Sequence, residues 1–502
     1  MADDAFIDPR QRVRGLAGEH CDGIQRGPAM SEESNLESMS AVDRAWLEMD
    51  TPHNPMIMCG LLELQGACEP QALARTIGER LVRSPRFRQR ALLERHPPAW
   101  APDGEMDPHY HLRIVTLEDP DEDALREAIA SEMSLALDRA RPLWRCTLFV
   151  RRGGHVSVLF RAHHAMGDGI SMMRILTSQG DGAEAPSCEP ALTAHGGPLG
   201  RWIDRLSTAN AWLEAASRRL AEDMREPQRL KDHVRDARAA VTAVSHVLRL
   251  DAGDQPRALR PHLTGHRHYA WSGSLSLASL RRTARRHGVH LNDLFLAALA
   301  GGLREWLLWR DVDLHHQAEV RVAIPVDLRA MGDHRLGNHF GLVIVSLPTS
   351  LESRVERLRR CADRMSQLKA SGEARALLTA LGAAGHLPGI VERQVSAHIS
   401  AKAVAVVSNV PGPDEVVRIG GMKVKDIVFW PPQAAEMGLG VSLLSYAGQV
   451  TLGVCTDAAL EDEPRQLVGF IEAELDAYLA PVRQRAPRRK HPAVSERGAL
   501  SS

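Results

Sequence analysis

The segment 161–169 contains the residues best suited to move a proton, because it places His163, His164 and Asp168 within a few positions of one another. An unperturbed imidazole titrates at about pH 6.5, so histidine is the usual proton carrier in catalysis at neutral pH. The apolar stretch 156–160 precedes the histidines and predicts a strand, while helical spacing follows them. We therefore expect both rings where a strand ends, a place from which rigid scaffolds present reactive side chains. This arrangement indicates general-base catalysis.

Asp168 and the two glycines around it determine how the histidines are displayed. The Asp168 carboxylate could bind backbone groups or a basic partner, or it could orient the His164 ring directly. We favour the first interpretation, because a carboxylate at the start of a helix is a good N-cap. Gly167 and Gly169 are expected to allow backbone turns that a Cβ atom would oppose.

Two other interpretations of the same residues are weaker. His163 and His164 could be core histidines beside a capping Asp168, but the complete pattern at a strand exit favours a functional role. A metal site made by these three side chains would lack a second group of ligands, so we predict no metal. Further closely spaced histidines, which lie between charged residues or in a proline-rich loop, are His315, His316, His109 and His111.

Sequence motifs of several other catalytic classes are absent. No Gly-x-Ser-x-Gly element marks a serine hydrolase. Neither a phosphate-binding Gly-x-x-x-x-Gly-Lys-Ser/Thr loop nor a Gly-x-Gly-x-x-Gly fingerprint after a strand occurs. The pattern that remains favours general-base catalysis without a covalent enzyme intermediate.

Length, charge and cysteine usage limit the class of protein. A chain of 502 residues is long enough for about two to four domains that fold without disulfide or metal support. Lys and Arg number 62 against 63 Asp and Glu, a balance that argues against a nucleic-acid partner. The 7 cysteines are scattered and form no Cys-x-x-Cys pair. We therefore expect neither a disulfide framework nor a thiolate zinc site, but a reducing, cytoplasmic compartment.

The ends of the chain and one uncharged stretch bear on membrane association. Residues 1–35 contain no apolar core of a secretory signal and are expected to form a flexible leader. The basic run 483–490 indicates a disordered tail, or alternatively attraction to anionic lipid head groups. Residues 437–456 carry no charge over a length that could span a membrane, but apolar residues alternate there around turn residues 446–449. We interpret this stretch as a β-hairpin and the protein as soluble or peripheral to a membrane.

Strands that alternate with long helices predict an α/β or α+β fold, with mixed sheets in two layered halves joined by a helical connector. Helix ends are marked by Gly288 after helix 275–287 and by Asn292, the expected N-cap of helix 292–309. The expected divisions are a leader (1–35), an N-terminal half (36–180), a linker and helical connector (181–264), a C-terminal half (265–480) and a tail (481–502). Further strands are expected at 57–64, 145–151, 155–162, 319–326, 340–347, 403–408 and 423–430, and further helices at 70–83, 121–137, 351–369, 373–399 and 461–479.

Several segments resemble a known family. The pattern His163-His164-x-x-x-Asp168-Gly169 is similar to the His-His-x-x-x-Asp-Gly motif of the CoA-dependent acyltransferase superfamily, which includes chloramphenicol acetyltransferases and peptide-synthetase condensation domains. Further segments narrow the resemblance to the bacterial wax ester synthase/diacylglycerol acyltransferase family. They are Met39–Asp43 with Thr51–Met56, Pro142-Leu143-Trp144, Asn292-Asp293 and the segment 408–413. The resemblance runs from about residue 38 to residue 480.

This resemblance implies a fold of two chloramphenicol-acetyltransferase-like halves with the active site in a tunnel between them. It implies that His164 is the general base that takes a proton from an acceptor hydroxyl, while His163 and Asp168 shape the loop. The hydroxyl oxygen would attack acyl-CoA, which is a substrate, and no cofactor is expected. The acceptor would be a long-chain alcohol or a diacylglycerol, and the enzyme would be peripheral to the inner membrane or to lipid inclusions.

The other matched residues have structural alternatives to a role in substrate binding. They are Pro142, Leu143, Trp144, Gly169, Asn292, Asp293, Asn409, Pro411 and Gly412. The Pro-Leu-Trp element is expected mainly to pack, with its proline ending the preceding helix. The Asn-Asp pair is expected to cap a helix, or else to brace the tunnel or meet substrate. The late Asn-x-Pro-Gly element could be a bare turn, or a loop that closes on the acyl or CoA group.

The superfamily also offers two other functions. A condensation-type enzyme would take acyl groups from a carrier protein, and no carrier domain is fused within this sequence. A non-catalytic, lipid-binding relative would coat lipid droplets, but His164 and Asp168 are intact. The Asp-Phe-Gly-Trp-Gly element of the acetyltransferase branch has no counterpart, and the nearest segment is 437–440. We therefore predict an acyl-CoA-dependent O-acyltransferase.

Overall fold

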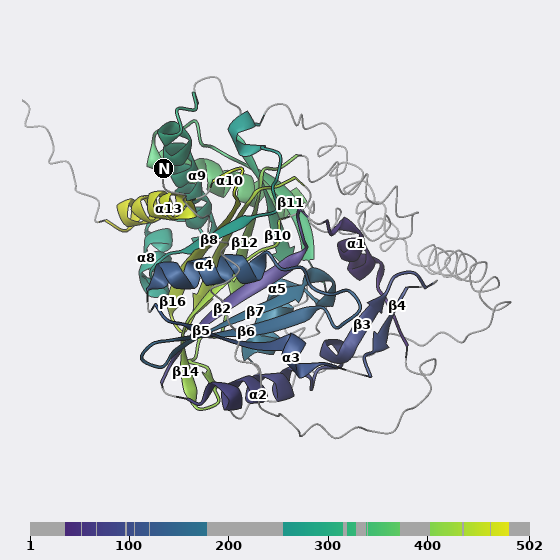
Figure 1. Ribbon diagram of the computed structural model, residues 1–502. Coiled ribbons are helices and arrows are strands. Elements are labelled where there is room, and N and C mark those ends of the chain that lie inside the picture. Colours follow the sequence, from purple (N-terminus) through teal and green to yellow (C-terminus); the bar gives the residue numbers. More distant parts are fainter. Residues whose placement is uncertain are drawn as a thin grey trace, which may run out of the picture.

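The computed structural model describes residues 36–177, 255–314, 319–327, 338, 340–371 and 402–480, apart from positions 52, 67, 96–97, 105, 120, 434–435 and 462. The predicted leader, the connector helices, the helix at 373–399 and the basic tail lie outside these residues. Two large mixed sheets with surrounding helices make up the fold (Figure 1). The expected combination of helices with mixed parallel and antiparallel sheets is thereby confirmed.

The first sheet has six strands in the order β13-β14-β2-β7-β6-β5. Neighbouring strands are antiparallel except for the parallel pair β5 and β6. Helix α2 (Pro70–Leu81) covers this sheet and buries Leu73, Ile77 and Leu81, whose spacing puts them on one helix face. The strands are β2 (Ile57–Gln65), β5 (Leu112–Leu117), β6 (Trp144–Arg151), β7 (His155–His163), β13 (Arg418–Ile419) and β14 (Met422–Trp430).

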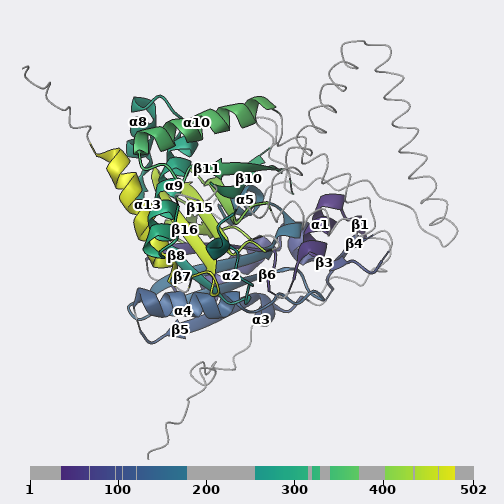
Figure 2. The same ribbon diagram turned by 90° about the horizontal axis from the view of Figure 1, so that it is seen from above.

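The second sheet has seven strands, in the order β11-β10-β12-β15-β16-β8, with β9 paired to β16. The strands are β8 (Arg267–Trp271), β9 (Leu275–Ser276), β10 (Val320–Asp327), β11 (Phe340–Leu347), β12 (Ala405–Pro411), β15 (Leu439–Tyr446) and β16 (Gln449–Asp457). Its core is shared with α9 (Leu291–Trp309), which is apolar and buried along most of its length. Figures 1 and 2 show α8 (Leu277–Arg286), α10 (Arg354–Ser371) and α13 (Pro464–Leu479) gathered around α9.

Three shorter elements surround the end of β7, where the histidines lie. They are α1 (Ala41–Met49), the 3₁₀ turn η4 (His164–Met166) and α5 (Gly169–Thr177). Helix α1 packs directly against η4. Beside α1 lies a small third sheet of β1 (Glu37–Ser38), β4 (Ala99–Pro102) and β3 (Gln89–Leu92), visible on the right of Figure 1. The histidines are therefore enclosed by parts of the chain that are distant in sequence.

Strands β13 and β14 come late in the chain but belong to the first sheet. Strand β14 pairs with β2, so that Trp430 lies opposite Cys59. The same strand also contacts β15 and β16 of the second sheet. A hydrophobic pattern can predict that a segment is a strand, but it does not predict which other strand it pairs with. The predicted domain boundaries stay a prediction, and the first sheet includes β13 and β14 from the predicted C-terminal half.

Turn residues in the sequence correctly predicted one hairpin and the end of one helix. The predicted hairpin in the uncharged stretch is confirmed as β15 and β16, which pair through their whole length. Ala447 and Gly448 connect them with φ of 46° and 78°, the backbone geometry that matches hairpin twist. Gly288, with φ of 69°, follows α8 as predicted. Among the described residues, no helix is both long and apolar enough to cross a bilayer.

Several predicted boundaries were wrong. Helix α4 (Glu122–Met133) ends well before Pro142, so this proline does not terminate it. Helix α9 begins at Leu291 with His290 as its N-cap, and Asn292 lies inside the first turn. A carboxylate at the third helical position can reach back to the residue before the helix. Asp293 does so, because its Oδ2 accepts from the His290 N–H at 2.9 Å, which confirms capping by the aspartate but not by the asparagine.

Two other local expectations also need correction. Strand β12 extends to Pro411, and the ladder pairs Asn409 with Leu443 of β15. The expected turn or loop is therefore a strand at these positions, because regular pairing with β15 continues past the apolar residues. His109 and His111 lie in the short helix α3 (Pro108–His111), not in a loop, because Asp107 caps its first turn through the His109 N–H.

Candidate active site

Main-chain hydrogen bonds at the end of β7 fix the position of the two histidines. The N–H of His163 donates to Leu143 O at 2.9 Å, and the N–H of His164 donates to Met56 O at 2.8 Å. Strand β7 therefore gives way to the turn η4 between the neighbouring strands β6 and β2. Gly167 has φ of 155° and ψ of 170°, a combination that only glycine adopts readily. The predicted need for glycine at this turn is confirmed.

Asp168 begins helix α5. Its Oδ1 accepts from the N–H of Ser171 at 2.9 Å, so the interpretation as a helix cap is confirmed. Gly169 lies inside α5 and does not have a positive φ, so the expected turn at this glycine was wrong. Its missing Cβ instead makes room for Phe429, whose ring Cζ lies 3.1 Å from the position that a Cβ would take.

His164 is buried and enclosed by α1 and Asn338. The ring stacks on Trp46 with centroids 4.1 Å apart and an interplanar angle of 18°. Its Nδ1 lies 3.0 Å from Asn338 Oδ1. The Asn338 Nδ2 donates to Asp43 Oδ1 at 2.8 Å and to the His164 carbonyl at 2.9 Å. Asp43 and Trp46 lie on one face of α1, because residues three apart are neighbours on a helix.

The surroundings of His164 keep its ring neutral. Burial lowers the pKa of His164 to about 4, although the negative charge of Asp168 opposes this shift. At neutral pH the ring is therefore neutral, with a proton on only one of its two nitrogens, the form that a general base requires. Desolvation raises the pKa of Asp43, and the hydrogen bond from Asn338 opposes that rise.

The His163 ring lies next to the carboxylate of Asp50. Its Nδ1 accepts from the Ala165 N–H at 3.1 Å, and its Nε2 lies 3.6 Å from Asp50 Oδ2. The Asp50 carboxylate also accepts from Arg139 at 2.9 Å and from the Met56 N–H at 2.8 Å. Burial alone would raise the pKa of Asp50, but these contacts outweigh it and lower the pKa. Asp50 is therefore ionised at neutral pH.

A cavity of about 450 Å³ lies beside His163, between the two large sheets. A volume of this order is typical of sites for small ligands. Its walls come from β2 and β14 of the first sheet, β8 and β16 of the second, and the loop after α4. The apolar lining includes Ile57, Cys59, Met133, Leu137, Leu143, Tyr269 and Trp430, and the charged lining consists of Asp50, Arg139 and Arg267. His163, rather than His164, is the motif histidine that lines this cavity.

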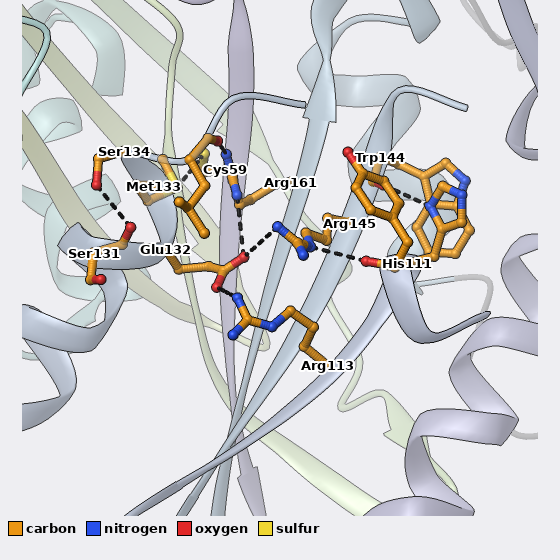
Figure 3. Close-up of polar contacts among 12 residues, drawn as sticks. Cys59, His111, Arg113, Ser131, Glu132, Met133, Ser134, Trp144, Arg145 and Arg161 are labelled. Carbon is orange, nitrogen blue, oxygen red and sulfur yellow. Dashed lines mark hydrogen bonds and ion pairs between the residues drawn. The ribbon is translucent and has the colours of Figure 1, made fainter. Parts of the chain in front are cut away.

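A buried ion cluster supports the cavity wall after α4. Glu132 is 4% exposed and lies among three guanidinium groups (Figure 3). These belong to Arg113, Arg145 and Arg161, at 2.6, 3.5 and 3.3 Å respectively. Arg161, which is fully buried on β7, also donates to Leu135 O in the loop. One side chain thus ties the strand that bears the histidines to the loop that lines the cavity.

The thiols in the cavity are not suited to nucleophilic catalysis. Cys59 and Cys455 both line it, and burial raises the pKa of each to about 12. A thiol with this pKa is protonated at neutral pH, and the thiolate is the nucleophilic form. Within the part of the chain that is described, no group of three or more His, Cys, Asp or Glu side chains is placed to hold a metal ion.

The structure brings only some of the predicted residues to the histidines. Leu143 lines the cavity, while Pro142 is buried beside it. Trp144 is completely buried and its Nε1 donates to Phe87 O at 2.9 Å, as expected for a packing residue. The Pro-Leu-Trp element therefore anchors β6 next to the motif and contributes one side chain to the cavity wall.

The remaining matched residues serve structural contacts in the described part of the chain. Asn292 and Asp293 start α9, which packs against α8, α10, α13 and β11. Asn409 and Pro411 are exposed on β12. The N–H of Gly412 donates to Ser445 O at 2.8 Å, and a Cβ at this glycine would lie only 2.5 Å from that oxygen. These contacts explain Asp293 as a helix cap and Gly412 as a residue without room for a Cβ. The predicted roles of all these residues toward substrate stay predictions.

Sequence reasoning missed most side chains that contact the two histidines. Asn338 is 174 residues away from His164, and no local pattern links them. Trp46 and Asp50 lie close to the opening segment that carried the family resemblance, but no role could be assigned to them. The one available signal was the spacing of Asp43 and Trp46, which would place both on a single face of a helix, but no helix was predicted for this segment.

Comparison with known proteins gives consistent results at the level of sequence. The model of the wax ester synthase/diacylglycerol acyltransferase catalytic domain matches residues 39–295, and that of the WS/DGAT C-terminal domain matches residues 336–478. A probable diacylglycerol O-acyltransferase of Mycobacterium tuberculosis strain H37Rv is 26% identical over 483 residues, which cover 92% of this chain and 99% of that protein. A putative diacylglycerol O-acyltransferase of the same strain is 27% identical over 410 residues, covering 76% and 81%.

Solved structures show the same fold. The wax ester synthase/diacylglycerol acyltransferase from Marinobacter aquaeolei VT8 superimposes with a TM-score of 0.61 at 20% identity, covering 88% of this chain and 98% of that one. The first condensation domain of the calcium-dependent antibiotic synthetase gives a TM-score of 0.56 at 17% identity, covering 89% and 97%. At these identities the structural matches establish the fold and not the activity.

Proposed function

Since the chain belongs to the wax ester synthase/diacylglycerol acyltransferase family and is an acyltransferase, we propose that it moves a fatty acyl group from acyl-CoA to a long-chain alcohol or a diacylglycerol. The products would be free CoA and either a wax ester or a triacylglycerol. The family model of the catalytic domain includes both histidines and Asp168.

His164 acts as the general base in this proposal. The neutral ring accepts the proton of the acceptor hydroxyl while the hydroxyl oxygen bonds to the thioester carbonyl carbon. The carbon–sulfur bond then breaks, and the proton passes from the ring to the departing CoA sulfur. The observation that carries the proposal is the position of His164, which is buried directly after β7 with its ring held by Trp46 and Asn338. The lowered pKa of the ring agrees with a neutral form at neutral pH. A positioned base of this kind contributes roughly 10²–10⁴-fold to the rate. The thioester is already an activated acyl donor, so the reaction needs no cofactor.

The cavity beside His163 supports a lipid as substrate. Its apolar walls are suited to a hydrocarbon chain, since burying each methylene contributes about 0.8 kcal/mol. Its charged residues, Asp50, Arg139 and Arg267, are suited to the polar end of such a molecule. His163 and Asp168 shape the turn that carries the base, through the Ala165 N–H and the cap of α5.

The test is release of CoA thiol from palmitoyl-CoA by the purified full chain, with hexadecanol or a diacylglycerol as acceptor. His164→Ala should abolish ester formation, while circular dichroism and the melting temperature stay near those of the unchanged protein. Turnover by this variant at the original rate would refute His164 as the base. A preference for acyl-carrier-protein donors over acyl-CoA would instead favour a condensation-type enzyme.

We also propose that the enzyme works at a lipid surface, because the chains of both substrates are poorly soluble in water. The basic run 483–490 would favour an anionic surface by ~1 kcal/mol per basic residue near it. Sedimentation with vesicles of phosphatidylcholine, with and without phosphatidylglycerol, measures this attraction. Equal binding to both kinds of vesicle would contradict a role for the basic run.

A further inference from the structure

Two residues from distant parts of the chain contact the His164 ring, and a third residue binds one of them. Asp43 and Trp46 come from α1, and Asn338 lies just before β11. Trp46 covers one face of the ring at a centroid distance of 4.1 Å, and Asn338 contacts its Nδ1 edge at 3.0 Å. The ring is therefore restrained in both its plane and its rotation by groups outside the histidine motif.

The orientation of the Asn338 amide follows from its other partners. Its Nδ2 lies 2.9 Å from the His164 carbonyl oxygen, which can only accept a hydrogen bond. The same Nδ2 lies 2.8 Å from Asp43 Oδ1, and a carboxylate also accepts. With the amide nitrogen satisfied by two acceptors, the amide oxygen must be the atom that faces the ring.

This orientation determines which nitrogen of His164 carries the proton. A neutral imidazole has one N–H donor and one acceptor nitrogen. Because the Asn338 oxygen can only accept, Nδ1 is the donor, and the lone pair resides on Nε2. The alternative tautomer would set the Nδ1 lone pair against the amide oxygen and would leave a buried hydrogen bond unmade.

We propose that Asn338 is a positioning residue that holds His164 in its Nδ1–H tautomer, with Asp43 fixing the direction of the Asn338 amide. Nε2 is then the atom that accepts the hydroxyl proton, so this inference rests on the proposed role of His164. When the ring becomes an imidazolium, its Nδ1–H bond to Asn338 becomes charge-assisted and stronger. Asn338 accepts no proton in this scheme; it sets the form of the base and stabilises its charged state.

Substitution of Asn338 should reduce the rate of the chemical step and not the binding of substrate. Asn338→Leu removes the acceptor at nearly constant volume, and we expect kcat to fall by about 10²-fold while KM changes less than about threefold. Asn338→Ala is the second variant, for use if leucine does not fit. Gln71→Leu, at an exposed position on α2, is the control for loss of a side-chain amide. An unchanged kcat in a folded Asn338 variant would overturn the proposal.

Variants of Asp43 separate the direction of the amide from the charge of the carboxylate. Asp43→Asn keeps an oxygen that can accept from Asn338, so it should lose less kcat than Asp43→Leu, which keeps none. If both variants lose kcat equally, the carboxylate charge is what matters and Asp43 does not act by fixing the amide.

The tautomer itself can be measured independently of turnover. Nitrogen-15 spectra of histidine-labelled protein distinguish a ring nitrogen that carries hydrogen from one that does not, and the His164 signals are those missing in His164→Gln. We expect a bare Nε2 in the unchanged protein and a shift toward the other tautomer in Asn338→Leu. A protonated Nε2 in the unchanged protein would refute the inference. A bare Nε2 combined with full turnover by His164→Ala would uphold the tautomer and refute the proposed function.

Discussion

His163 and His164 are neighbours in the chain, but they belong to two different regions of the molecule. The cavity side consists of His163, Asp50 and the residues that line the cavity of about 450 Å³. The α1 side consists of His164, Trp46 and Asn338. On the cavity side, charges and apolar walls surround an open volume. On the α1 side, an aromatic ring and an amide hold one imidazole.

Strand β14 contacts both the cavity and α5, the helix that follows the histidine turn. Phe429 packs over Gly169 at the start of α5, whereas Trp430 lines the cavity. Successive side chains of a strand point to opposite faces, so one strand can serve both regions. Two residues that are adjacent in the chain therefore need not share a function. We infer that the cavity side binds substrate and the α1 side prepares the base.

The largest difference between the two sides should appear when each histidine is replaced by glutamine. His164→Gln removes the base, and we expect kcat to fall by about 10²–10⁴-fold. His163→Gln keeps an oxygen that can accept from the Ala165 N–H, so kcat should fall by about tenfold or less. Single-turnover release of CoA measures both. Equal losses would show that the two histidines act as one unit, and the division into two sides would be wrong.

Stability should depend strongly on the ion cluster that supports the cavity side. Arg161→Met leaves Glu132 with less compensation in a buried site, and loss of one partner of a buried pair typically costs about 3–5 kcal/mol. Arg113, whose side chain is 31% exposed, is the matched comparison, and Arg113→Met should cost about 1 kcal/mol. Urea unfolding measures both free energies.

The same variants also distinguish support of the cavity from support of the base. Because Arg161 binds the carbonyl of Leu135, its loss should loosen the loop and raise KM more than it lowers kcat. A fall in kcat with unchanged KM would place Arg161 functionally on the α1 side instead.

The pH dependence of unfolding should report the burial of His164. Its pKa falls from 6.5 to about 4 on folding, so the unfolded chain binds more protons between these values. The neutral His164 ring therefore makes its full contribution to the free energy of unfolding above pH 6.5, and this contribution is lost as the pH falls toward 4. The loss amounts to about 3 kcal/mol, at about 1.4 kcal/mol for each pKa unit.

Glutamine at position 164 does not titrate in this range. Between pH 6.5 and pH 4, the free energy of unfolding of His164→Gln should therefore fall by about 3 kcal/mol less than that of the unchanged protein. Urea titrations of both proteins at the two ends of the range give the difference. Parallel curves would mean that the ring is not held neutral by burial.

Local features of this division could be predicted from the sequence. The apolar strand before His163, the cap at Asp168 and the glycine at position 167 each act within a few residues, and the structure confirms them. The hairpin of β15 and β16 was also predictable, because alternation and turn residues are local signals. Asn292 failed as an N-cap because His290 and Asp293 together provide an equally local alternative.

The long-range features could not be predicted in this way. Asn338 meets His164 across 174 residues, and β14 pairs with β2 although hundreds of residues separate them. Strand pairing and side-chain contacts of this kind depend on the whole packed structure, for which a single sequence carries no local signal. The α1 side is therefore the region that sequence reasoning described least, although it holds the proposed base.

The smallest expected effect concerns Gly169, where β14 contacts α5, the helix that follows the histidine turn. In Gly169→Ala the new methyl group would lie 3.1 Å from the Phe429 ring, so α5 or the ring must shift, at a cost of about 1 kcal/mol. Gly104→Ala is the matched control, because nothing lies within 4 Å of its Cβ position and its φ is not positive. The control should be neutral or stabilising by up to about 1 kcal/mol.

Thermal and urea unfolding compare the two alanine variants, and Phe429→Leu in the Gly169→Ala background tests whether the ring is the obstacle. A smaller side chain should recover most of the lost stability if the contact is steric. Because Asp168 caps α5, a shifted helix should lower kcat through the α1 side and leave KM, which depends on the cavity side, nearly unchanged. A rise in KM alone would mean that β14 couples the two regions, since Phe429 and Trp430 would then move together.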